Sequence, residues 1–134
     1  MGLWAALAAS LLAATTQPAR VVLAPIDDRP ATGQFARMIG AIAGVDVQTP
    51  PQELLGRFTT PGNPDAVLSW LERQNLNESQ AVVVSAEMVC FGGLVASRTD
   101  ATPLEAAMAR LDRLRDIRRA NPDTPFYVFA TIPR

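Results

Sequence analysis

The chain has 134 residues, a length that fits a single domain. Hydrophobic residues make up 49% of the sequence and charged residues 19%, which excludes a disordered chain and predicts a packed core. The formal net charge of −1 and the aromatic content of 6% provide neither a basic surface nor many stacking rings. We therefore expect no nucleic-acid partner.

Two residue types are absent. The sequence contains no histidine, and all 12 of its basic side chains are arginine. This excludes Ser–His and Cys–His catalysis, histidine-bound zinc or haem, lysine Schiff bases and the P-loop lysine from these residues. Any chemistry here must use carboxylates, hydroxyls, arginine, the backbone or the thiol of Cys90, which we expect to be a buried apolar residue. No cofactor is indicated, although carboxylate oxygens would favour a hard divalent ion if a metal binds.

Residues 1–19 resemble a secretory signal peptide. Leu3–Ala14 is an apolar run, followed by a short polar stretch and the small residue Ala19. The run is shorter than the roughly 20 residues that cross a bilayer, so we expect no stable membrane span. No Lys or Arg precedes it, which leaves an uncleaved anchor or a misassigned start codon as alternatives. We predict export to the periplasm or the exterior, with residues 20–134 forming one α/β domain.

Three strands and two helices are predicted next in the chain. The β-branched run 21–26 predicts a buried strand, and apolar residues at helical spacing predict a helix with one apolar face (Phe35, Met38, Ile39, Ile42). Val45–Val47 is a short second strand that ends before Pro50–Pro51. Asn63 fits a helix N-cap, with Pro64 at the first helical position. The run 81–85 predicts a third strand.

The last part of the chain predicts one more helix and one more strand. Thr102 to Glu105 has the spacing of a capping box, and the helix should end at Asn121–Pro122. Its arginines alternate with Asp112 and Asp116, which is typical of a solvated helix face and not of a basic patch. Phe126–Ala130 predicts the fourth strand.

This alternation of strands and helices predicts an α/β fold. We expect a three-layer, doubly wound sheet of about four mainly parallel strands, Rossmann-like or flavodoxin-like. In such sheets ligands bind beyond the carboxyl ends of the strands, where the strand order reverses. The first and third strands should flank this switch point, so the loops after them are the candidate functional surface.

The turn after the first strand contains Asp27, Asp28 and Arg29. Adjacent side chains on an extended backbone point to opposite sides, so we expect one of the two carboxylates to face a ligand. Asp27 and Asp28 are candidate catalytic groups, and Arg29 is a candidate ligand-binding group. The alternative is that one aspartate caps the next helix or pairs with Arg29.

The segment after the third strand, residues 85–98, is predicted to be a second loop at the same site. Glu87 is a candidate catalytic or metal-binding acid, since paired carboxylates divide acid and base roles or share a divalent ion. Gly92 and Gly93 permit a close approach of the backbone to a ligand, and Ser97 and Arg98 are candidate ligands for an anionic or hydroxyl-rich group. The two glycines are also ordinary turn residues.

A third loop, after the second strand, contains Arg57 and Thr60. Both are candidate ligand-binding residues on the same edge of the sheet. We favour the simpler interpretation of this loop as a turn that leads to the cap of the next helix. No motif for a nucleotide or for a serine nucleophile is present in the sequence.

Three ordered motifs together resemble a known family. They are Pro25–Pro30, then Pro50–Gly56 with Thr60–Gly62, then Ser85–Met88 with Phe91–Arg98. The chain is similar to the N-terminal part of the bacterial domain of unknown function 4127 family, which implies no established activity. Members of that family are several times longer, so the resemblance implies a truncated copy, a fragment or one part of a split protein that lacks a C-terminal half. The family commonly has Asp where Glu87 stands and Tyr where Phe91 stands.

Two hypotheses of function follow from the sequence. The first is an exported hydrolase that acts on a glycan or another polar small molecule, with the three acids as catalytic groups and the arginines as clamps. The alternative is a noncatalytic ligand-binding or scaffolding domain, or a truncated remnant of the family. The sequence does not decide between them.

Overall fold

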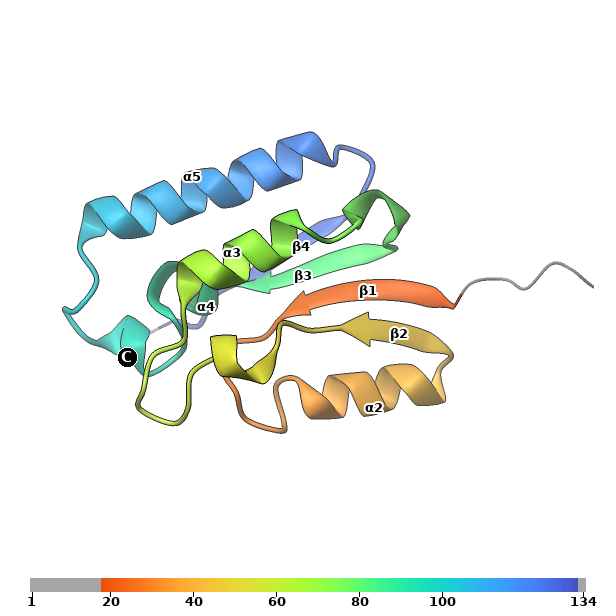
Figure 1. The fold of residues 1–134 in the computed structure, drawn as a ribbon, viewed down its shortest axis with the longest axis horizontal. Coiled ribbons are helices and arrows are strands. Elements are labelled where there is room, and N and C mark those ends of the chain that lie inside the picture. Colours follow the sequence, from red (N-terminus) through yellow and green to blue (C-terminus); the bar gives the residue numbers. More distant parts are fainter. Residues whose placement is uncertain (1–17, 133–134) are drawn as a thin grey trace, which may run out of the picture.

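The computed structural model describes residues 18–132, and it confirms the α/β fold (Figure 1). The strands are β1 (Ala19–Ala24), β2 (Val45–Gln48), β3 (Ala81–Ser85) and β4 (Phe126–Phe129). They form one four-stranded parallel sheet in the order β2-β1-β3-β4, which is the flavodoxin-like order. The predicted signal peptide lies outside the described residues except for its last two positions, of which Ala19 belongs to β1.

Helices cover the sheet in two layers. Helix α2 (Gln34–Ile42) lies beside β2 on one face, while α3 (Pro64–Glu72), α4 (Ala86–Phe91) and α5 (Leu104–Ala120) pack together on the other (Figure 1). Within residues 18–132, no helix has the length and apolar character needed to cross a membrane.

The hydrophobic core lies between the sheet and α3, α4 and α5. Val22, Val82 and Val84 are fully buried, and they occupy alternate positions of β1 and β3. They belong to the same buried cluster as Leu68 and Leu71 of α3. The alternation of buried and half-buried residues along these strands shows that one face of the sheet supplies most of the core.

The two predicted helix starts have different outcomes. Asn63 is the N-cap of α3, as predicted, and its side chain accepts a hydrogen bond of 3.0 Å from the backbone N–H of Ala66. The predicted capping box of α5 is wrong. Pro103 is the N-cap and has no capping side chain, so Glu105 occupies the second helical position instead of the third that the box requires.

The prediction of a loop over residues 85–98 is also wrong. This segment contains α4 and a short 3-10 helix, Ala96–Arg98. Ser85 caps α4, since its hydroxyl accepts a hydrogen bond of 3.4 Å from the N–H of Met88. Gly92 ends the helix in the left-handed region, at φ 88°. A six-residue helix is too short to show a helical period in the sequence.

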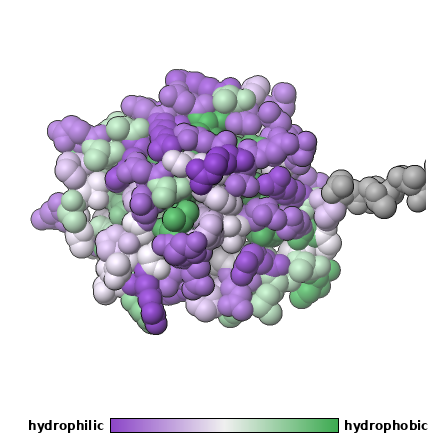
Figure 2. All heavy atoms as spheres, viewed as in Figure 1, coloured by the Kyte–Doolittle hydropathy of each residue, from purple (hydrophilic) through white to green (hydrophobic). Residues whose placement is uncertain are grey.

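Helix α2 has the predicted apolar face, but this face is exposed to solvent. The exposed fractions of its four apolar residues range from 51% to 89% (Phe35, Met38, Ile39, Ile42). Gly40 faces the sheet instead, because a Cβ atom on it would lie only 2.5 Å from Cγ2 of Val47. Figure 2 shows a mainly hydrophilic surface in the view of Figure 1, with a hydrophobic group at the margin where β2 and α2 lie.

Two arginines of α5 bind α3 across the outer layer. Arg110 forms an ion pair of 2.8 Å with Asp65 and donates a hydrogen bond of 2.7 Å to the carbonyl oxygen of Cys90. Arg113 pairs with Glu72 at 2.6 Å. Some arginines of α5 therefore form contacts between helices. The sequence pattern alone does not distinguish them from arginines that pair on a solvated face.

Candidate functional site

The candidate site lies at the carboxyl ends of the strands, where the order reverses. From β1 the chain passes to β2 on one side, and from β2 it returns to β3 on the other side of β1. The turn after β1 and the segment after α4 meet at this point around a hollow of about 220 Å³. Asp27, Asp28, Arg29, Gly92 and Gly93 line the hollow. This is the switch-point crevice that the sequence predicts.

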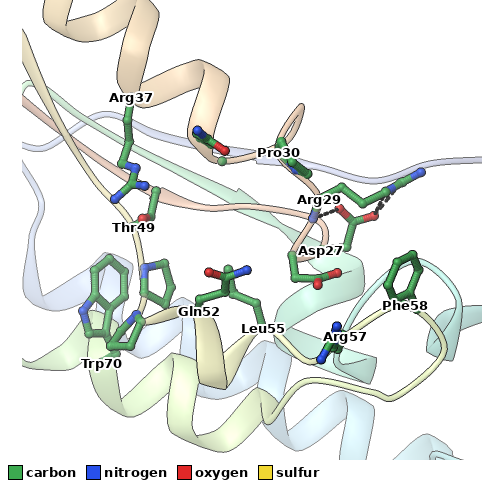
Figure 3. A pocket seen from close by; sticks show the side chains of 15 residues that line it. Asp27, Arg29, Pro30, Arg37, Thr49, Gln52, Leu55, Arg57, Phe58 and Trp70 are labelled. Atoms are coloured by element: carbon green, nitrogen blue, oxygen red, sulfur yellow. Dashed lines mark hydrogen bonds and ion pairs between the residues drawn. The ribbon is translucent and has the colours of Figure 1, made fainter.

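A second hollow of about 610 Å³, called the larger hollow from here on, adjoins it between the loops that follow β1 and β2 (Figure 3). Its polar lining combines the Asp27–Arg29 turn with side chains from α2 and from the segment after β2, including Arg37, Thr49, Gln52 and Arg57. Leu55 and the buried Trp70 form part of its apolar wall. Charged, polar and apolar side chains therefore share one hollow at this edge of the sheet.

Asp27 holds the turn together. Its carboxylate accepts hydrogen bonds from the backbone N–H of Arg29 at 3.1 Å, from Nε of Arg29 at 2.7 Å and from the hydroxyl of Thr32 at 2.9 Å. Partial burial raises the pKa of Asp27, but these hydrogen bonds outweigh it and the pKa lies below its usual value. The alternative interpretation, in which one aspartate pairs with Arg29, is therefore correct for Asp27.

Asp28 differs from Asp27 in its contacts. It lines both hollows above and a third of about 630 Å³ beside the 52–61 segment. Within residues 18–132 its side chain has no hydrogen bond or ion pair. It is half-buried, so part of its carboxylate is available to a ligand.

The loop that contains Arg57 and Thr60 is both a turn and part of the crevice. The two residues exchange backbone hydrogen bonds of 3.0 Å and 2.8 Å, and Phe58 between them has a positive φ of 51°. This confirms the turn. Arg57 also lines two of the hollows, and Thr60 lines two. Both residues therefore lie at the crevice.

Gly92 and Gly93 line the smaller hollow, and Gly92 has a structural reason to be glycine. A Cβ atom on it would lie 2.6 Å from the carbonyl oxygen of Gly62, and its own carbonyl accepts a hydrogen bond of 2.8 Å from the N–H of Gly62. The φ of Gly93 is 127°, a region that side chains disfavour. Gly92 therefore brings the loops after β2 and α4 into contact at the wall of the crevice.

Glu87 has different contacts from the two aspartates. It is 5% exposed and lines none of the three hollows. Its carboxylate accepts hydrogen bonds from the hydroxyl of Ser85 at 2.8 Å, from the hydroxyl of Thr131 at 2.6 Å and from the N–H of Thr131. Burial raises the pKa of Glu87, but these hydrogen bonds outweigh it and the pKa is lowered. The contacts attach the segment after β4 to α4.

Two other predicted residues have no side chain in the crevice lining. Ser97 donates a hydrogen bond of 2.8 Å to the carbonyl oxygen of Leu94, and neither Ser97 nor Arg98 lines the three hollows. Cys90 is buried, as predicted, and its burial raises the pKa of the thiol to about 11. A thiol with that pKa is protonated at neutral pH and is a weak nucleophile.

Sequence reasoning missed part of the lining. It did not select Arg37, Thr49, Gln52, Phe58 or Trp70, although all five line the larger hollow. Thr49 immediately follows the end of β2 and Gln52 lies four residues after it, and that position was a usable signal. Arg37 lies within a helix and Trp70 within another, and no local pattern shows that both reach the same hollow.

The described residues do not contain a ready-made metal centre. Among residues 18–132, no group of three or more Cys, Asp or Glu side chains is placed to hold a metal ion. Two of the acids expected to share such an ion have protein partners instead. Asp27 binds Arg29, and Glu87 binds Thr131.

Comparison with known proteins identifies the family. The model of the family described as "Protein of unknown function (DUF4127)" matches residues 21–134, so the chain belongs to this family. No curated protein and no solved structure matches the chain.

Proposed function

We propose that the crevice binds a small, hydroxyl-rich polar molecule such as a fragment of a glycan. The observation that carries this proposal is the position of Asp28, an acceptor without a protein partner in the described structure that lines three adjoining hollows. A half-buried carboxylate of this kind gains most from a ligand that donates hydrogen bonds to it.

The neighbour of Asp28 supports a hydroxylated ligand. Arg57 lines two of the same hollows and has no side-chain hydrogen bond within residues 18–132. A carboxylate only accepts hydrogen bonds and a guanidinium only donates them, whereas a hydroxyl does both. One ligand hydroxyl can therefore satisfy Asp28 and Arg57 together. Phe58 and Trp70 add ring surfaces against which the apolar side of a sugar can pack.

The geometry favours binding over hydrolysis. Glycan hydrolysis normally needs two carboxyl groups that face the same bond, one as the acid and one as the base or nucleophile. Asp27 is occupied by Arg29 and Thr32, and Glu87 by Thr131 and Ser85, which leaves Asp28 as the available acid among the three candidates. We therefore propose a ligand-binding domain, and we propose export on the basis of the N-terminal apolar run.

The test is a titration of the protein with neutral monosaccharides and oligosaccharides, in which ligand-observed NMR measures the binding. We expect wild-type protein to bind at least one of them, and we expect D28N to weaken that binding by about tenfold, because the amide offers fewer acceptor sites than the carboxylate. D123N is the matched control, since Asp123 is an exposed aspartate outside the three hollows. Equal binding by wild type and D28N would contradict the proposal.

The same samples test hydrolysis. Incubation of the oligosaccharides with wild-type protein, followed by an assay of new reducing ends, should show no turnover above a protein-free control. Turnover that D28N or E87Q abolishes would restore the hydrolase hypothesis.

A further inference from the structure

We infer that the ligand carries an oxyanion, a carboxylate or a phosphate, and that Arg37 binds it at one end of the larger hollow. This inference rests on the proposed function, because it names the chemical class of the molecule that the same hollow takes. The ligand would be a small hydroxylated anion, with the sugar acids as the simplest example.

The charges that line the hollow do not balance. Three guanidinium groups belong to the lining (Arg29, Arg37, Arg57), but only two carboxylates do (Asp27, Asp28). Asp27 and Arg29 form an ion pair of 2.5 Å and neutralise each other. Arg57 and Asp28 share two hollows, so the charge of Arg57 is matched by a carboxylate in the same space. One positive charge, that of Arg37, remains without an acid.

Arg37 is also distinguished by its contacts. Its guanidinium has no hydrogen bond or ion pair with the described residues, whereas Arg110 and Arg113 on α5 are bound to acids of α3. In Figure 3 its side chain extends from α2 toward Thr49, at the end of the hollow away from Arg57 and Phe58. It is therefore a donor directed at the hollow and not at another part of the protein.

The groups around Arg37 suit an oxyanion. Thr49 contributes a hydroxyl and Gln52 a side-chain amide to the same lining, and both are hydrogen-bond donors. An arginine presents parallel N–H groups that match the two oxygens of a carboxylate or of a phosphate. The backbone of α2 that carries Arg37 is held against β2 by the close contact of Gly40 with Val47.

The two ends of the hollow then recognise different parts of one molecule. Asp28 and Arg57 bind hydroxyl groups at the switch-point end, and Arg37 binds the anionic group at the β2 end. A neutral sugar satisfies the first end alone. We therefore expect the anion of a sugar acid or a sugar phosphate to bind more tightly than the neutral sugar.

The experiment compares glucose, glucuronate and glucose 6-phosphate as probes, which share a ring and differ at one position. Affinities are measured by ligand-observed NMR with the full chain. We expect glucuronate or glucose 6-phosphate to bind about tenfold more tightly than glucose, as one arginine–oxyanion contact should provide. The tighter of the two anions identifies a carboxylate or a phosphate as the recognised group.

The substitution R37Q tests which residue is responsible. We expect it to remove the preference for the anion, so that the anion and glucose bind within about twofold of each other. R119Q is the matched control, because Arg119 is an exposed arginine of α5 outside the three hollows. Arg37 is exposed, so we expect the variant to fold, and its circular dichroism spectrum and melting temperature check this.

The possible failures are distinct. If glucose, glucuronate and glucose 6-phosphate all bind equally and D28N weakens the binding of all three, this inference is wrong and the proposed function stands. A preference for the anion that persists in R37Q would also overturn the inference, because another group would then bind the anion. If none of the three probes binds but another neutral sugar does, the inference fails and the proposed function stands; if no sugar binds, both fail.

Discussion

The two faces of the sheet differ in how completely they are covered. On the face that packs against α3, α4 and α5, the side chains of Val22, Val82 and Val84 are fully buried. On the other face, the residues that alternate with them in the same two strands, Val21, Leu23 and Val83, are only half-buried. Both faces are built from the same strands, so the difference comes from the helices that reach each face and not from the residues of the strands.

Helix α2 explains the open face. It packs closely against β2 through Gly40, and it presents its apolar stripe to solvent and not to β1 or β3. Burial of apolar surface is the main source of folding stability. The covered face should therefore supply most of the stability, while the open face contributes little to it in the described structure.

The largest effect should come from the covered face. Leu68 lies on α3 with no exposed surface, so Leu68→Ala leaves a cavity in the core. We expect it to lower the free energy of unfolding by about 2–5 kcal/mol. Urea denaturation followed by circular dichroism measures this, and a loss below about 1 kcal/mol would contradict our assignment of the core.

A smaller effect should come from Glu87, which joins α4 to the segment after β4. Glu87→Ala removes the acceptor for Thr131 and for Ser85, and we expect a loss of about 1–3 kcal/mol. The chemical denaturation of this variant at pH 7 tests the estimate. A neutral result would show that the attachment of Thr131 adds nothing to stability.

The same residue predicts a pH dependence. The pKa of Glu87 is lower in the folded protein than its ordinary value of 4.5, so the ionised form stabilises the fold. This contribution is fully present above pH 4.5, and it is lost as the pH falls through the folded pKa. Melting temperatures of wild type and Glu87→Gln should therefore converge below pH 4.5, and a constant difference would exclude this linkage.

The smallest effect should come from the open face. Ile39 is 67% exposed, and isoleucine and serine have similar helix propensities. We expect Ile39→Ser to change the free energy of unfolding by less than about 0.5 kcal/mol. A loss comparable with that of Leu68→Ala would mean that the stripe of α2 is buried in solution.

Much of the fold could be predicted because its signals are local. Four β-rich segments, the helical pattern between them and the Asn63 cap depend on neighbouring residues, and the structure contains all of them. The position of the crevice was also predictable, since parallel strands place their carboxyl ends at one edge. For the same reason the sequence selected the turn of Asp27 and Asp28.

Only the tertiary structure decided which residues of the site are available to a ligand. Asp27 and Asp28 are identical in the sequence pattern, yet one is bound by Arg29 and Thr32 and the other is open to the crevice. Glu87, a candidate from the sequence, is bound by Thr131 far away in the chain, whereas Arg37, which the sequence did not single out, lines the larger hollow. The availability of a charged group depends on which distant side chains reach it, and the spacing of residues along the chain does not contain that information.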